Sequence, residues 1–179
     1  MIKYTILLII LSSQVIAREI GQTEITTDEG IEVFQDEKYY LLKKNVNIIS
    51  DEFNLSADLV KAFFEKDLYD ITKIECSGNV IFDSNIGGFA KGKKLNFIPS
   101  SNLIEISGIN SSLTYNDLKM TSDEKIIIND SLGTFNLKGK SSNLQTKEIN
   151  IFGNIIFWKY QKNQKINEII SLTVIDKKI

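Results

Sequence analysis

Short apolar stretches recur along the chain at intervals of about 30 residues. They open at Ile25, Leu55, Phe89, Met120 and Ile149, and each leads to an apolar pair that precedes a polar turn. The pairs are Val33-Phe34, Phe63-Phe64, Phe97-Ile98, Ile127-Ile128 and Phe157-Trp158. Both landmarks shift together in the longer second unit, which argues against a chance match. The spacing predicts about five degenerate strand–turn–strand repeats of roughly 30 residues.

The second strand of each unit alternates between apolar and polar side chains. The apolar positions are Leu42, Ile74, Cys76, Ile104, Ile106, Phe135 and Leu137, and the positions beside them include Lys43, Glu75, Glu105, Asn136 and Lys138. Because successive side chains of a strand face opposite sides, one face of the sheet is apolar and the other is solvated. Each strand ends at a small or polar break, such as Ser77-Gly78-Asn79. This pattern is typical of an all-β sandwich or barrel-like sheet.

One segment also fits a helix. Residues 57–67 follow Ser56, which could cap an amphipathic helix over this stretch. The repeat favours a strand, because the same stretch aligns with others that have strand patterns, and helix propensity alone is weak evidence.

The apolar position beside each turn has two interpretations. It is occupied by Val33, Phe63, Phe97, Ile127 and Phe157. A repeated apolar column is ordinarily core, which is the interpretation that the sequence alone favours. The column would instead line a channel for an apolar guest, such as acyl chains, if two sheets closed incompletely over it.

The first 17 residues have the pattern of a secretory signal peptide. Lys3 precedes an apolar stretch at residues 5–11, and polar residues then lead to Ala17. A membrane anchor is the alternative, but a spanning helix needs about 20 apolar residues and Ser12, Ser13 and Gln14 interrupt this run. We expect a cleaved signal peptide at 1–17, one domain at 18–158, and a last strand or tail at 159–179.

Composition argues against catalysis. The chain has no histidine, which removes the commonest general base and metal ligand, and its single cysteine, Cys76, falls in an apolar column. Acidic pairs such as Asp51-Glu52 lie at turns without the spacing of a calcium loop, so solvated turn residues are expected there. The basic residues are dispersed, which does not suit a nucleic-acid face. We expect no enzyme activity, no cofactor and no metal.

Several short motifs resemble a known family. In order they are Ile25-Thr26-Thr27-Asp28, Asn45-Val46-Asn47-Ile48, Leu55-Ser56-Ala57-Asp58 with the apolar residues after it, and Gly78-Asn79-Val80. Together with the signal peptide, they resemble the LptA/OstA-like periplasmic proteins of lipopolysaccharide transport, whose domain is also called organic solvent tolerance-like. The resemblance covers roughly residues 23–158.

The resemblance implies a twisted, incompletely closed β-jellyroll whose apolar groove shields lipopolysaccharide acyl chains between the inner and outer membranes. Its partners would be an inner-membrane LptC-like protein, an outer-membrane LptD-like protein and further copies stacked head to tail by strand pairing. Ile25 would lie near the receiving edge, and the groove would be lined by Leu55, Phe63, Val80, Phe82, Leu95, Phe97, Ile104 and Ile106, with Val33, Ile127 and Phe157 from the turn-proximal column. Lys61 and Lys125 occupy positions that are apolar in sister units, which interrupts this pattern.

Other functions fit the same pattern. The chain could be a structural cell-envelope β-repeat protein with a filled core, or a membrane-anchored LptC-like partner of the same fold. A secreted hydrolase that uses carboxylates fits least well, because no histidine or nucleophile motif is present.

Overall fold

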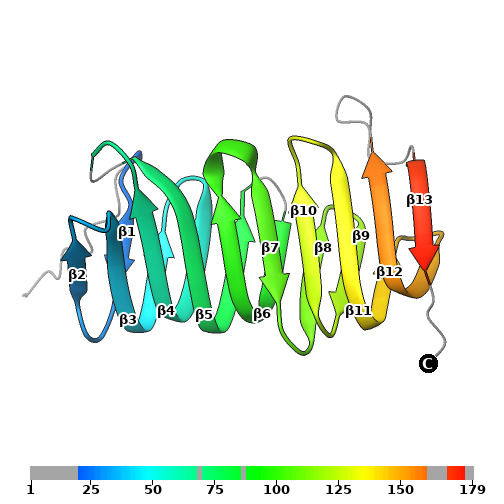
Figure 1. Ribbon diagram of the computed structural model, residues 1–179, viewed down its shortest axis with the longest axis horizontal. Helices are drawn as coiled ribbons and strands as arrows, with labels where there is room; N and C mark the ends of the chain where they lie inside the picture. Colours follow the sequence, from blue (N-terminus) through cyan, green and yellow to red (C-terminus); the bar gives the residue numbers. More distant parts are fainter. Residues whose placement is uncertain (1–19, 68–69, 86–87, 161–168, 176–179) are drawn as a thin grey trace, which may run out of the picture.

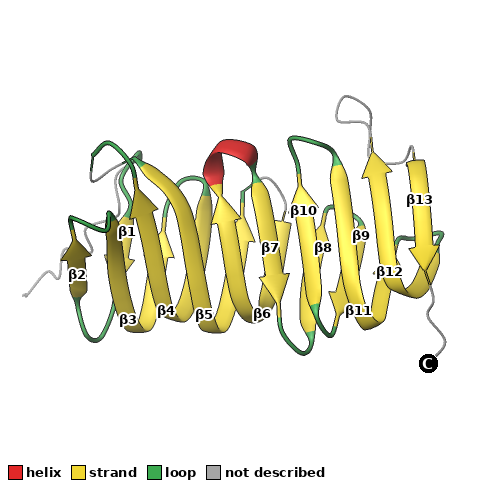
Figure 2. Cartoon of the chain, viewed as in Figure 1, coloured by secondary structure: helices red, strands yellow, loops and turns green. Residues whose placement is uncertain are grey.

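The computed structural model describes residues 20–67, 70–85, 88–160 and 169–175, which form an elongated all-β molecule (Figures 1 and 2). The all-β class predicted from the repeat is confirmed. The strands are β1 (Glu24–Thr26), β2 (Ile31–Phe34), β3 (Tyr39–Ile49), β4 (Phe53–Phe64), β5 (Ile71–Ser84), β6 (Gly88–Ile98), β7 (Leu103–Ser107), β8 (Ser111–Tyr115), β9 (Leu118–Ser122), β10 (Lys125–Asn129), β11 (Thr134–Gln145), β12 (Asn150–Tyr160) and β13 (Ile169–Ile175). A short 3₁₀ helix, η1 (Pro99–Ser101), connects β6 to β7. The predicted signal peptide at 1–17 lies outside the described residues.

Neighbouring strands pair in the order β1-β3-β4-β5-β6-β7-β10-β11-β12-β13. Strand β2 also pairs with β3, while β8 and β9 connect β6 to β11 along a second route. Residues 57–67, for which a helix was the alternative, mostly belong to β4, so the strand prediction is correct. Strand β13 lies within the C-terminal stretch that the sequence left open between a strand and a tail.

The sheet folds back on itself to make two layers. The first layer contains β2, β7, β10, β13 and the parts of β3–β6, β11 and β12 that continue it; the second contains β1, β8, β9 and the remaining parts of those long strands. In Figure 1 the long strands turn from one layer to the other along the lower edge of the molecule. The layers are therefore joined by continuous strands along one side.

Left-handed backbone conformations mark these corners. Lys44 and Asn45 have φ of 63° and 50°, and Gly78 and Asn79 have φ of 75° and 47°. The strand register shifts at the same places, between Lys43 and Val46 in β3 and between Ser77 and Val80 in β5. An extra residue in a strand bends it and increases its twist. The polar breaks of the repeat are therefore the points where strands cross between layers.

An aspartate from the preceding strand or loop supports several corners. Asn45 Nδ2 donates to Asp28 Oδ2 at 2.6 Å, and Asn79 Nδ2 donates to Asp58 Oδ2 at 3.0 Å. At a later corner the backbone N–H of Ser141 donates to Asp123 Oδ1 at 3.2 Å. Asp28 and Asp58 are 30 residues apart, so this contact accounts for part of the repeat.

The interior holds continuous rows of apolar side chains that are paired across strands. One row, in the first layer, is Ile31, Leu42, Val60, Cys76, Leu95, Ile106, Ile126, Leu137 and Ile156. A facing row, in the second layer, is Ile25, Ile48, Leu55, Phe82, Ala90, Leu113, Met120, Leu144 and Ile151. Most of these side chains are fully buried. The predicted alternation of the second strands is confirmed, because Leu42, Cys76 and Leu137 all face this core.

Candidate functional site

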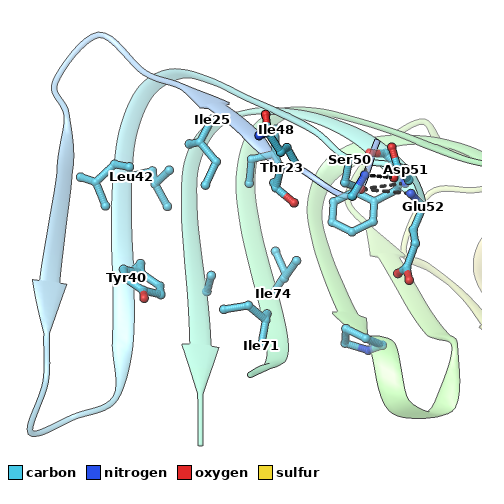
Figure 3. A pocket seen from close by; sticks show the side chains of 16 residues that line it. Thr23, Ile25, Tyr40, Leu42, Ile48, Ser50, Asp51, Glu52, Ile71 and Ile74 are labelled. Atoms are coloured by element: carbon cyan, nitrogen blue, oxygen red, sulfur yellow. Dashed lines mark hydrogen bonds between the residues drawn. The ribbon is translucent and has the colours of Figure 1, made fainter. Parts of the chain in front are cut away.

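An apolar pocket of about 880 Å³ opens between the two layers at the N-terminal end of the molecule (Figure 3). Its lining residues are Gly21, Gln22, Thr23, Ile25, Ile31, Tyr40, Leu42, Ile48, Ser50, Asp51, Glu52, Phe53, Ala62, Ile71, Ile74 and Pro99. They come from β1 to β5, from the adjoining turns and from η1, which contributes Pro99. The volume lies within the range of ordinary small-molecule sites, and a mostly apolar wall with few polar groups is what such sites have.

The pocket lies where the interior rows reach the end of the sheet. Ile25 of β1 pairs with Ile48 of β3 on one wall, and Ile31 of β2 pairs with Leu42 of β3 on the other. Among the described strands, β1 and β2 each pair only with β3, so no further strand covers these side chains. Ile25 and Ile31 are accordingly 41% and 48% exposed, whereas Leu42 is 1% exposed.

A tight turn with acidic side chains forms part of the pocket rim. Ser50 Oγ accepts the backbone N–H of Phe53 at 3.0 Å and donates to the Phe53 carbonyl at 2.9 Å. The carboxylate of Asp51 accepts the N–H of Gly21, which ties the chain before β1 to this rim. Asp51 and Glu52 are the charged residues in the described lining. The rim is therefore negatively charged, and the wall beneath it is apolar.

Phe53 of the pocket lining packs against two further phenylalanines, Phe82 and Phe97. The ring centroid of Phe53 lies 5.5 Å from that of Phe82 and 5.6 Å from that of Phe97, and the Phe82 and Phe97 centroids are 5.4 Å apart. Phe82 belongs to the second layer and Phe97 to the first, so this cluster joins the layers. Such aromatic pairs contribute about 0.5–1.5 kcal/mol each beyond their buried area.

Farther along, the interior is a closed core. Ile126, Phe135, Leu137, Leu144 and Ile156 are 0% exposed. A hydrogen-bonded cluster also joins the layers here: Tyr115 Oη of β8 donates to Asp130 Oδ1 at 3.2 Å, and Tyr160 Oη donates to the same oxygen at 2.9 Å. Burial, followed by the interaction with Asp130, raises the pKa of both tyrosines above the ordinary value of 10, so both hydroxyls stay protonated donors.

The structure places the residues predicted for a groove in four groups. Ile25 lines the pocket. Leu55, Val80, Phe82, Leu95, Phe97, Ile104 and Ile106 lie in the buried interior beyond or beside it. Val33 pairs with Tyr40 at the sheet end and is 48% exposed.

The remaining residues, Phe63, Ile127 and Phe157, lie on the outer face. Their neighbours on either side, such as Ile126 and Ile128, or Ile156 and Trp158, are the buried ones. The repeat alignment caused this difference, because in these three units the buried position beside the turn is one residue later, at Phe64, Ile128 and Trp158. A shift of one residue moves a strand side chain to the opposite face. The structure therefore does not bring these three side chains into the interior.

Lys61 and Lys125 do not interrupt the interior. Both lie on the outer face, where Lys61 Nζ is 3.7 Å from the ring centroid of Tyr39 and Lys125 Nζ is 2.8 Å from Glu105 Oε1. The interior positions beside them are Val60, Ala62 and Ile126, which are apolar and buried. The apolar rows continue past both lysines.

Sequence reasoning did not identify several residues of the pocket wall. Ile31, Tyr40, Ile48, Phe53 and Ile71 line it, although none was assigned to the groove. The available signal was their place in the first two repeats. In the first unit of a series of repeats, the apolar row has no preceding unit to cover it, so an opening is expected there.

Within 20–67, 70–85, 88–160 and 169–175, no three or more His, Cys, Asp or Glu side chains are grouped as metal ligands. The same part of the chain contains no helix with the length and hydropathy required to cross a membrane.

The sequence matches no model of a known protein family and no curated protein. The structure is similar to the crystal structure of LptH from Pseudomonas aeruginosa, described as the LptA-homologous periplasmic component of the conserved lipopolysaccharide transport device. The TM-score is 0.52 at 10% sequence identity, and the match covers 88% of this chain and 96% of LptH. The chain therefore shares its fold with an LptA-like protein.

Proposed function

We propose that this chain is a periplasmic carrier that shields the acyl chains of lipopolysaccharide on their way from the inner to the outer membrane. The observation that carries the proposal is an apolar pocket of about 880 Å³ at the uncovered end of a fold shared with LptH. The bound part of the lipid is the hydrocarbon, because each buried methylene contributes about 0.8 kcal/mol and the inner wall offers no charge.

The charges at the rim favour one orientation of the lipid. Asp51 and Glu52 would repel a phosphorylated head group close to the turn between β3 and β4. The acyl chains then enter between the layers, and the phosphates lie away from this turn, toward solvent or a partner protein.

Transfer between proteins would use the sheet ends. Strands β1 and β2 flank the pocket mouth, and an added strand on either would extend a layer by backbone hydrogen bonding. An LptC-like protein, an LptD-like protein or a second copy of this chain that paired there would place its own apolar interior against the pocket. Lipid could then pass from one interior to the next without exposure to water.

In-cell photo-crosslinking at two adjacent tyrosines tests the proposal. Tyr40 lines the pocket, whereas Tyr39 lies on the outer face against Phe34 and Phe63. An aromatic photo-probe replaces either side chain with little change in size. We expect lipopolysaccharide adducts from position 40 and none from position 39. Adducts from neither position, with both variants folded, would contradict lipid carriage.

The closed core beyond Phe53 favours one other function, that of a structural cell-envelope β-repeat protein. Its filled interior needs no guest, and Ile126, Phe135 and Leu144 leave no surface for one. Lipid extraction of the purified protein separates the two functions, since only the carrier would retain lipid. The mass of the intact mature protein would in turn distinguish the carrier from a membrane-anchored LptC-like partner, because only the carrier should have the mass of a chain that starts at Arg18.

A further inference from the structure

Phe53 stands at the boundary between the pocket and the closed core. It is the first residue of β4, it lines the pocket, and its ring is half-buried. Behind it lie Phe82 and Phe97, which are 1% and 6% exposed. The ring of Phe53 therefore presents one side to the pocket and the other to a buried aromatic pair.

The position of this ring is fixed from both ends. Its backbone is held by Ser50, whose N–H donates to the Phe53 carbonyl at 3.0 Å and whose hydroxyl bonds the Phe53 N–H and carbonyl. From the turn directly after β5, the N–H of Asn85 donates to the Glu52 carbonyl at 3.0 Å. The ring packs near-parallel to Phe82, with an interplanar angle of 28°, and edge-on to Phe97, with an angle of 75°. Displacement of the ring would break several of these contacts at once.

The region behind the ring has no room for a guest. Leu55 and Ala90, the strand partners of Phe82 in the second layer, are 2% and 1% exposed, and Leu95 of the first layer is 1% exposed. Interiors of this kind are packed with few voids larger than a water molecule. The ring of Phe53 therefore blocks an apolar chain that enters the pocket from going deeper.

We propose that Phe53 is a specificity-determining residue that sets the length of acyl chain the pocket accepts. The inference rests on the proposed function, because it requires an apolar chain as ligand. Each methylene that fits in front of the ring strengthens binding by about fourfold. Methylenes beyond that limit remain in water or force the chain to bend, and they add nothing.

The test is a series of saturated monoacylglycerols that differ only in chain length, titrated into the purified protein. A neutral head group avoids repulsion by Asp51 and Glu52. For the wild type we expect affinity to rise about fourfold per methylene and then to level off. Phe53→Ala should move the plateau to longer chains, with about fourfold tighter binding for each further methylene admitted. Phe53→Trp should move it to shorter chains.

The opposite shifts of the two variants separate a length limit from a loss of folding, since destabilisation cannot strengthen the binding of long chains. Phe89→Ala is the matched control, because Phe89 is an exposed aromatic on the outer face and should leave the plateau unchanged. If the wild type binds but the plateau stays in place in both Phe53 variants, the length limit is wrong and the carrier function stands. If the wild type binds no chain of any length, both are wrong.

Discussion

Gly78 occupies the corner of β5 directly beneath the side chain of Asp58. Its φ is +75°, and a Cβ at this position would lie 2.7 Å from Cβ of Asp58 and would collide with the carboxylate. The same carboxylate accepts hydrogen bonds from Asn79. The corner therefore requires glycine for two separate reasons, its backbone conformation and the space above it.

Two single substitutions, one at Gly78 and one at Gly30, separate the effect of backbone strain from the effect of the collision with Asp58. Gly78→Ala should lower the free energy of unfolding by about 3 kcal/mol or more, because Asp58 must move in addition to the backbone strain. Gly30→Ala is the control: its φ is +82° but nothing lies within 4 Å of its Cβ, so only the strain of about 1 kcal/mol applies. Urea denaturation of both variants measures the difference. Equal losses would mean that the contact with Asp58 is unimportant.

Cys76 should behave as an inert core residue. Burial, with a smaller contribution from Glu75, raises the pKa of its thiol to about 12. At pH 8 the folded protein should therefore react with a thiol reagent far more slowly than the urea-unfolded chain, whose thiol has its ordinary pKa. Above pH 9 the unfolded chain loses a proton that the folded chain keeps, so the free energy of unfolding should fall as pH rises. Rapid labelling in native buffer would contradict this assignment.

At the level of strands, the alternation of apolar and polar residues correctly predicted which side chains face the core, wherever the repeats were aligned in the right register. Cys76, Ile106 and Leu137 face the core as their pattern indicates. The opening of the third unit was misaligned, because Phe89 was taken as the equivalent of Leu55 although Ala90 occupies that place. A large aromatic is the natural choice for an interior position, but the structure places Phe89 outside, where Lys91 Nζ lies 5.2 Å from its ring centroid.

The pocket could not be predicted in the same way. Ile31, Ile48 and Leu95 have equivalent apolar patterns, yet the first two line the pocket and the third is enclosed in core. The difference has two causes: β1 and β2 are the last strands at their end of the sheet, and Phe53 contacts Phe97 across the layers. Contacts between layers depend on the fold as a whole, so no local pattern in the sequence reports them.

The hydrogen bond from Tyr115 to Asp130 joins β8 of the second layer to the turn after β10 in the first. Tyr115→Phe removes this bond while the ring can stay against Phe135, at 5.8 Å between centroids. We expect the free energy of unfolding to fall by about 1–2 kcal/mol. Tyr39→Phe, on the outer face, is the matched control and should change it by less than about 0.5 kcal/mol. Thermal and urea unfolding measure the difference. Identical midpoints for the two variants would mean that the hydrogen bond to Asp130 does not stabilise the fold.

For the whole molecule, the two ends of the sheet are the places where strand pairing with another copy would occur. Val33 of β2 is 48% exposed at the N-terminal end, and Ile81 of β5 is 41% exposed in the middle of the sheet. If copies stack end to end, Val33→Lys should abolish concentration-dependent association, because lysine on an edge strand opposes strand pairing. Ile81→Lys carries the same change away from the edge and should associate like the wild type. Sedimentation velocity measures the association of both variants. If the two variants associate to the same extent, pairing through β2 is excluded.

The strands run across the molecule, and the long axis is built from their lateral spacing. In the described part of the chain, ten strands between β1 and β13 form the main hydrogen-bonded path, and neighbouring strands lie about 4.8 Å apart. One additional repeat, which crosses each layer twice, would extend the protein by about 10 Å without altering its cross-section. The length of such a protein is therefore set by how many repeats its sequence contains.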